Sequence, residues 1–215
     1  MRSISFLFLV ICFSMYSFGH DDNWKMSKNE SGIVVHTKNN SSSRIKEVKA
    51  SAIMNCEISE ITAAILDVSK YTNWVYECSV SNLIRENSKI DKVYYLVTNV
   101  PWPVSDRDMV FHIKAGINKN NHSVEITAVT LKDEIPEKEG MVRVNYSMIK
   151  WEIKQIQPGK IELLYWLKGD PGGEYPDWIL EMFMVSGPFN SIKALKTIVE
   201  KGNYKQNEID EILDW

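Results

Sequence analysis

Residues 168–191, KGDPGGEYPDWILEMFMVSGPFNS, begin as a turn and continue as an unusually apolar helix. Between Trp178 and Val185, only Glu181 is polar. A helix packed on one side normally shows an apolar stripe and an opposite polar face. We therefore expect this helix to be covered on two sides, with one side against the rim of a sheet and the other facing a hollow.

The chain before this helix is dominated by alternating apolar residues, which predict strands. One earlier helix is expected from Ser59 as its cap to about Trp74, with apolar positions at Ile61, Ala64, Ile65 and Val68. A change in the phase of alternation at Met148-Ile149 predicts a β-bulge. The predicted strands are 33–37, 44–56, 80–85, 93–100, 109–117, 124–131, 141–156 and 160–168.

The order of these elements predicts an α+β fold. Connections of hairpin length make the sheet antiparallel, and a sheet with one long helix forms two layers. The C-terminal helix should occupy residues 175–202, with an interruption at Gly187-Pro188. We expect this helix to cover the apolar concave face of a curved antiparallel sheet, with a hollow beside its first half.

Composition limits the functional class. The chain has 215 residues, 44% of them hydrophobic, and a net charge of −3, which fits one domain with a substantial core. No basic cluster is present to bind nucleic acid. His36, His112 and His122 are scattered along strand and turn segments and form no catalytic constellation with Ser, Cys or acidic residues in the sequence. No Cys/His spacing suggests a metal site. We therefore expect no cofactor, no metal and no catalytic residues.

Both ends of the chain carry separate predictions. Residues 1–19 combine Arg2, an apolar run and small residues at Ser17 and Gly19, which is typical of a signal peptide cleaved near Gly19. We expect a secreted or periplasmic protein whose domain is 20–204, followed by a short acidic amphipathic tail, 205–215. An oxidising compartment would permit a disulfide between Cys56 and Cys78, and two buried free thiols are the alternative.

Two motifs resemble those of one family, the START (steroidogenic-acute-regulatory-related lipid transfer) domains. PWPVSDRD, residues 101–108, is similar to the family signature P-x-P-x-S-x-R-D, and DPGG at 170–173 resembles the turn before its C-terminal helix. The resemblance covers about 24–204, because other family positions follow in the expected order: Trp24, Gly32, Ile33, Trp74, Pro136, Gly140 and Arg143.

The resemblance implies the helix-grip fold, in which a curved antiparallel sheet is wrapped around a long C-terminal helix. The internal hydrophobic cavity between them would form a tunnel for one lipid or sterol, and no catalysis is implied. It assigns a mainly structural role to the motif residues Pro101, Pro103, Arg107, Asp108, Asp170, Pro171, Gly172, Gly173, Pro176 and Trp178. Neither headgroup pair of the family carries over. Tyr94 and Ile113 stand at the positions of the acid and base of cholesterol-type members, and the Arg and Asp of phosphatidylcholine transfer members are missing near 71–75.

Strand alternation and the apolar helix together predict the ligand contacts. The expected cavity and lid residues are Tyr94, Leu96, Thr98, Phe111, Ile113, Tyr146, Tyr165, Met182, Phe189 and Ile192. Met182 and Met184 suit either an adaptable cavity wall or ordinary core packing.

The sequence favours an exported, monomeric module that binds or transfers one lipid or other hydrophobic ligand and contacts membranes transiently. One alternative is a helix-grip enzyme such as a polyketide cyclase or aromatase. The other is a cell-envelope interaction module whose own side chains fill the cavity.

Overall fold

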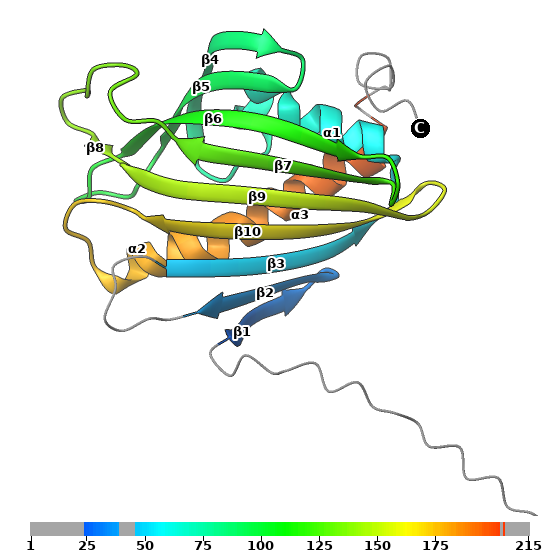
Figure 1. Ribbon diagram of the computed structural model, residues 1–215. Helices are drawn as coiled ribbons and strands as arrows, with labels where there is room; N and C mark the ends of the chain where they lie inside the picture. Colours follow the sequence, from blue (N-terminus) through cyan, green and yellow to red (C-terminus); the bar gives the residue numbers. More distant parts are fainter. Residues whose placement is uncertain (1–23, 39–45, 203, 205–215) are drawn as a thin grey trace, which may run out of the picture.

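The computed structural model describes residues 24–38, 46–202 and 204, and within them ten strands form one sheet (Figure 1). The predicted signal peptide, the serine-rich loop and the acidic tail lie outside these residues. The strands follow the order β1-β2-β3-β10-β9-β7-β6-β5-β4, with β8 paired to β6. Their bounds are β1 Trp24–Glu30, β2 Ile33–Lys38, β3 Lys46–Met54, β4 Cys78–Ser88, β5 Asp91–Thr98, β6 Arg107–Asn118, β7 Ser123–Thr130, β8 Val142–Arg143, β9 Tyr146–Gln157 and β10 Lys160–Asp170.

The helical elements lie together on one side of the sheet, behind it in Figure 1. They are α1 Ile58–Leu66, the 3₁₀ segment η1 Val68–Asn73, α2 Asp177–Glu181, the π-helical turn η2 Met182–Ser186 and α3 Gly187–Glu200. All adjacent strands pair antiparallel except β6 and β8, which are parallel. The predicted α+β class, with a curved antiparallel sheet wrapped around a long C-terminal helix, is confirmed.

The inner face of the sheet is shared between a packed core and a site. Helix α1 contacts α3, β7 and β9, so it fills one half of the concave face together with the C-terminal part of α3. Ile113 of β6, Ile153 of β9 and Leu195 of α3 are completely buried in this core. The other half lies beneath η2 and the start of α3, where the core is incomplete.

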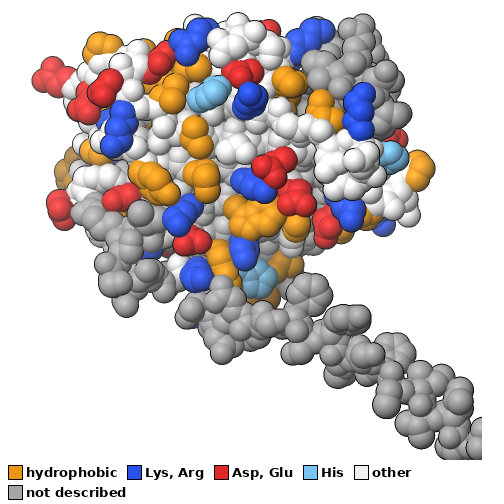
Figure 2. Space-filling view, viewed as in Figure 1, with side chains coloured by type: hydrophobic (Ala, Val, Ile, Leu, Met, Phe, Trp, Pro, Cys, Tyr) orange, Lys and Arg blue, Asp and Glu red, His pale blue; other side chains and the backbone are white. Residues whose placement is uncertain are grey.

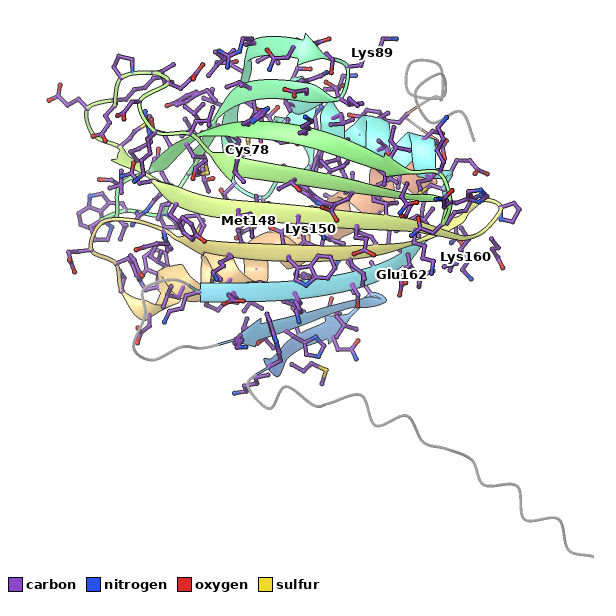
Figure 3. The ribbon with its side chains drawn as sticks, in the orientation of Figure 1. Cys78, Lys89, Met148, Lys150, Lys160 and Glu162 are labelled. Atoms are coloured by element: carbon purple, nitrogen blue, oxygen red, sulfur yellow. The ribbon has the colours of Figure 1, made fainter. Side chains whose placement is uncertain are left out.

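The outer face of the sheet is solvated. Figure 2 shows acidic, basic and apolar side chains interspersed over it, with no large area of one type. Met148 and Lys150 of β9 point outward there (Figure 3), and Lys150 forms an ion pair with Glu125 on the neighbouring strand β7. This pattern is typical of an exposed sheet surface rather than a ligand site.

Strand β1 was missing from the sequence prediction. Its sequence, WKMSKNE, is mostly polar and exposed, so it lacks the alternation that identifies a half-buried strand. Ser31 and Gly32 both have positive φ values, 55° and 73°, which give the tight hairpin turn that pairs β1 with β2. An exposed strand rich in lysine is a common way to protect a sheet edge.

The strand predicted at 141–156 is two strands, and the expected bulge at Met148-Ile149 is wrong. The chain breaks at Val144-Asn145, between β8 and β9. Met148 and Ile149 pair regularly with both neighbouring strands. The alternation looked broken because Met148 is an apolar side chain on the outer face, 40% exposed.

Helix boundaries also differ from the prediction in detail. Glu57, not Ser59, caps α1, and it forms a capping box with Glu60. The C-terminal helical region begins at Asp177 instead of residue 175, and Pro176 is the N-cap residue of α2. The expected interruption at Gly187-Pro188 takes the form of the π-helical turn η2, after which α3 continues. Among the described helices, none has the length and apolar character needed to cross a bilayer.

Candidate functional site

A cavity of about 160 Å³ lies between the concave face of the sheet and the lid segment, defined here as residues 177–191. Strands β5, β6, β9 and β10, the η1 region and the lid segment all contribute to its wall. The wall is almost entirely apolar and aromatic. Its residues are Tyr71, Trp74, Val75, Tyr76, Tyr94, Leu96, Thr98, Met109, Phe111, Val144, Ser147, Ile149, Trp151, Tyr165, Leu167, Gly169, Asp170, Pro171, Met182, Phe183, Met184, Gly187, Pro188, Ser191, Ile192 and Leu195.

The lid segment is apolar around most of its circumference because it is buried on two sides. Met182 lines the cavity and also packs with Val100 and Ile179 in a small rim cluster. Met184 belongs instead to the main core, and η2 lies against β2 and β3. The lid segment therefore bridges the β2–β3 side of the curved sheet and the loop after β5.

The π-helical turn in the lid segment has a steric cause. Pro188 has no N–H, and its ring would collide with the carbonyl group four residues earlier in a regular helix. The N–H of Gly187 instead bonds to the carbonyl oxygen of Met182, five residues back. A Cβ atom on Gly187 would lie 3.0 Å from that same oxygen, so only glycine fits without a shift.

Aromatic side chains form a continuous row along the cavity wall. The ring centroids of Trp74 and Tyr71 are 4.9 Å apart, those of Tyr71 and Tyr94 are 5.2 Å apart, and those of Tyr94 and Phe111 are 5.5 Å apart. The first two pairs meet edge to face, and the third is stacked. Such contacts make this part of the wall rigid.

The polar groups on the wall are nearly all uncharged. No Lys, Arg or His is among the lining residues, and Asp170 is the one carboxylate among them. The Asp170 carboxylate accepts a hydrogen bond from the N–H of Gly172, at 2.9 Å. Burial raises the pKa of the Tyr71, Tyr94 and Tyr165 hydroxyls, so they stay neutral at physiological pH.

The two sequence motifs meet through Arg107, whose side chain is completely buried. Its guanidinium donates to the carbonyl oxygens of Ser105 (2.5 Å), Gly172 (3.3 Å) and Pro171 (3.4 Å). Burial lowers its pKa. Arg107 thus links the turn that precedes the lid segment to the loop after β5. It does not line the cavity.

The Asp108 carboxylate is held by a second network of buried side chains. Arg143 donates to both of its carboxylate oxygens, at 3.0 and 2.9 Å, and the Tyr95 hydroxyl donates at 3.1 Å. The Asp108 carboxylate raises the pKa of Arg143, so the guanidinium stays protonated. Arg143 also bonds to the carbonyl oxygens of Ile135 and Pro136. The pair fixes β8 beside β6.

The remaining motif residues also shape the backbone. Gly172 and Gly173 have positive φ values, 72° and 65°, and a Cβ on either would crowd Val142. Pro101 and Pro103 lie exposed in the loop after β5. Trp178 is 42% exposed and Trp102 is 91% exposed.

Seven of the ten predicted ligand-contact residues lie on the cavity wall. They are Tyr94, Leu96, Thr98, Phe111, Tyr165, Met182 and Ile192.

The other three predicted contacts lie elsewhere. Tyr146 shares the outward face of β9 with Met148 and is 42% exposed. Ile113 is on the inner face of the sheet but deeper, in the packed core. Phe189 is buried against the β1–β2 edge, where Lys28 Nζ lies 3.9 Å from its ring centroid.

Several residues of the cavity wall were not predicted, and for two of them the sequence contained a feature that could have indicated their position. Tyr71 and Trp74 stand at the end of the first helix, where bulky aromatic residues in a short connection suggest a packed site. Ser147, Ile149 and Trp151 are the inward face of β9, and the mistaken bulge concealed their alternation. Gly169 continues the inward face of β10 that carries Tyr165 and Leu167, and Pro171 reaches the wall through the path of the turn.

The other candidate chemical groups do not gather into a site. Cys56 and Cys78 are buried free thiols, and burial raises the pKa of Cys56 to about 12 and of Cys78 to about 11. Both thiols stay protonated and are poor nucleophiles. In the part of the chain that the structure describes, no three His, Cys, Asp or Glu side chains are placed to hold a metal ion.

Comparison with known proteins gives consistent matches. A family model for the START domain matches residues 18–204. An uncharacterised protein of Pseudomonas aeruginosa is 28% identical over 181 residues, which cover 84% of this chain and 88% of the relative. Phosphatidylcholine transfer protein from Mus musculus is 22% identical over 177 residues, or 80% of this chain and 82% of the relative.

Solved structures support the same fold. The crystal structure of a STAR-related lipid transfer protein from Xanthomonas axonopodis superposes with a TM-score of 0.74 and 24% identity, covering 83% of this chain and 99% of the other. A Streptomyces aromatase/cyclase superposes with a TM-score of 0.53 and 12% identity, covering 76% and 98%.

Proposed function

Because this chain belongs to the START domain family, whose members bind and transfer lipids, we propose that it carries one lipid or other hydrophobic molecule in the cavity beneath the lid segment. The observation that carries this proposal is the apolar cavity, closed by a helix that is itself apolar on two sides. All of its wall comes from one chain, so a monomer suffices.

The driving force would come from the apolar walls. Each methylene group removed from water contributes about 0.8 kcal/mol, whereas a net hydrogen bond contributes about 1 kcal/mol. A lipid tail therefore gains most of its affinity from burial. The few polar wall groups are suited to discriminating between ligands.

Ligand entry requires the cavity to expand. Pockets for drug-sized ligands usually measure about 300–1,000 Å³, which is larger than the 160 Å³ present here. The flexible thioethers of Met182 and Met184 and the π-helical turn beside them give the lid segment the means to repack. We propose that the lid segment moves away from the loop after β5, admits the ligand and closes.

We propose that the ligand exchanges with a membrane at the rim of the cavity, where the loop after β5 meets the lid segment. Trp102, in the loop after β5, is 91% exposed, and that loop packs against the lid segment through Val104 and the rim cluster. An indole ring so exposed suits the interface between water and lipid headgroups. We also propose that the protein is exported, because residues 1–19 contain an apolar run typical of a signal peptide. The family match begins at residue 18, where that run ends.

Neither rival function is favoured by the cavity. An aromatase or cyclase reaction needs a group that transfers protons near neutral pH, whereas the wall offers neutral tyrosines and one hydrogen-bonded carboxylate. An interaction module with a filled interior does not fit the open space behind Met182 and Ile192.

The proposal is tested by native mass spectrometry of the freshly purified protein and of Met182→Asp. The wild-type protein should carry a hydrophobic molecule that extracts into organic solvent, and Met182→Asp should lose it because the charge lies on the wall. Thr197→Asp, on the exposed side of α3, is the matched control and should retain it. Undiminished retention by a folded Met182→Asp variant would contradict the proposal.

A further inference from the structure

Trp74 carries a hydrogen-bond donor with nothing to donate to. Its side chain is 5% exposed, and its Nε1 atom is the only buried side-chain nitrogen or oxygen that has no hydrogen-bond partner among the described residues. Native proteins satisfy nearly all buried polar groups, because an unpaired one loses its hydration without compensation. Trp74 also lines the cavity, and its Nε1 atom has less than 1 Å² of accessible surface there, so the cavity contents can supply a partner once the wall moves to admit a ligand.

The hydroxyls beside Trp74 are already engaged within the protein. The Tyr71 hydroxyl donates to the carbonyl oxygen of Ile65 at 2.6 Å. Tyr94 is hydrogen-bonded to Tyr71 in turn. The edge-to-face contact with Tyr71 holds the Trp74 ring in place. The aromatic row thus presents one fixed, unused donor.

The charge of the wall restricts what this donor can meet. A buried anion needs a countercharge, and the lining residues include no Lys, Arg or His. A cation has no lone pair to accept a hydrogen bond from the indole N–H, so it would leave this donor unpaired even with Asp170 on the wall to balance its charge. An uncharged oxygen with a lone pair satisfies the indole without either cost.

We infer that the cavity selects uncharged lipids that carry an acceptor oxygen, such as a ketone, ester or hydroxyl oxygen, and that Trp74 Nε1 donates to this oxygen. The inference rests on the proposed function, since it names the ligand class for the same cavity. Trp74 would contribute selectivity, and the apolar wall would contribute most of the affinity.

Four probes of similar length separate the possibilities: 2-heptanone, n-heptane, heptanoate and hexyltrimethylammonium. Each is titrated into the ¹⁵N-labelled protein while the indole N–H resonances are followed by NMR. We expect 2-heptanone to bind more tightly than the other three and to shift the Trp74 indole resonance downfield. Heptane should bind without that shift.

Trp74→Phe keeps an aromatic ring and removes the donor, and Trp151→Phe makes the same change elsewhere on the wall. Trp74→Phe should weaken 2-heptanone binding about five-fold, the effect of one neutral hydrogen bond, and leave heptane binding close to unchanged. Trp151→Phe should alter both probes to the same degree. The wild-type titration decides the question even if Trp74→Phe does not fold.

The outcomes separate this inference from the proposed function. Equal binding of heptane and 2-heptanone with no movement of the Trp74 resonance overturns the inference and leaves the proposed function standing. Tighter binding of heptanoate or of the ammonium probe overturns the assignment to uncharged ligands. If none of the four probes binds, the proposed function and the inference fail together.

Discussion

At the scale of single residues, Arg107 of the first family motif bonds to the backbone and does not line the cavity. The buried guanidinium of Arg107 donates to three carbonyl oxygens, and two of those oxygens belong to the turn before the lid segment. A planar group with several fixed donors can bridge two loops in this way, whereas an ammonium group cannot. Arg107 therefore links the loop after β5 to the position of the lid.

Replacing Arg107 with Met should destabilise the protein by about 2–4 kcal/mol, because charge-assisted hydrogen bonds are lost in the interior. The loss should be concentrated in the lid. Hydrogen exchange should accelerate for amides of α2 and η2 more than for those of β5 and β6. Arg107→Lys should recover only part of the effect.

The matched control is Arg85→Met. Arg85 is half exposed and pairs with Glu134 at the surface, so this change should cost less than about 1 kcal/mol. If Arg107→Met accelerated exchange equally in the lid and the sheet, Arg107 would be a general core residue and not a fastening for the lid.

At the scale of elements, the lid segment combines two structural requirements in one short stretch. Pro188 prevents a regular helical hydrogen bond, and Gly187 allows the chain to approach the Met182 carbonyl closely enough for a π-type bond. The result is a helix that changes geometry where it borders the cavity. π-helical turns are frequent at functional sites, and this one lies where movement is proposed.

Gly187→Ala tests this geometry because the direction of the change in the free energy of unfolding differs between a regular helix and the π-helical turn. In an ordinary helix the change stabilises by about 1 kcal/mol, but here the new methyl group would press on the Met182 oxygen at 3.0 Å. We expect a loss of about 1 kcal/mol or more, as in an overpacked site. Urea unfolding measures the difference.

Gly116→Ala is the control for this substitution. It also lies in a regular element at negative φ, and its added Cβ would meet the backbone oxygen of Glu125 at an ordinary contact distance of 3.9 Å. We expect this variant to be neutral or slightly more stable. A stabilised Gly187→Ala would show that the π-helical turn can return to a regular helix without strain.

At the scale of the whole molecule, the concave face is divided between stability and binding. α1 and the C-terminal part of α3 fill one half with a packed core. The other half keeps a cavity whose cover touches both sides of the curved sheet. This division lets the lid segment move while the core holds the sheet together.

Membrane exchange belongs to this scale because it involves the rim as a unit. Trp102→Ala should reduce sedimentation with neutral phosphatidylcholine vesicles several-fold, because the ring that enters the interface is removed. The thermal unfolding midpoint should not change, since the ring is 91% exposed.

Met148→Ala removes a partly exposed apolar side chain from the outer face of the sheet (Figure 3), so it should not affect vesicle binding. Equal binding by all three proteins would place the membrane contact somewhere other than the loop after β5.

The sequence by itself determined the class of fold, most strand positions and the family, because these depend on local alternation, turn residues and ordered motifs. It also predicted seven wall residues, since strand parity alone assigns Tyr94, Leu96, Thr98, Phe111 and Tyr165 to the inner face. Its errors were also local: Tyr146 followed from one exposed methionine that disguised the phase of β9.

Only the tertiary structure decided which inward residues pack and which surround the cavity. Ile113 and Tyr94 lie on the same face of the sheet, yet Ile113 is completely buried away from the cavity and Tyr94 lines it. The hydrogen-bond partners of Arg107 likewise come from a segment distant in the chain. The missing partner of Trp74 Nε1 also could not be seen in the sequence, because it depends on what surrounds the ring in the folded protein. Periodicity indicates the direction of a side chain, whereas its neighbours depend on how the sheet curves and where the helices lie.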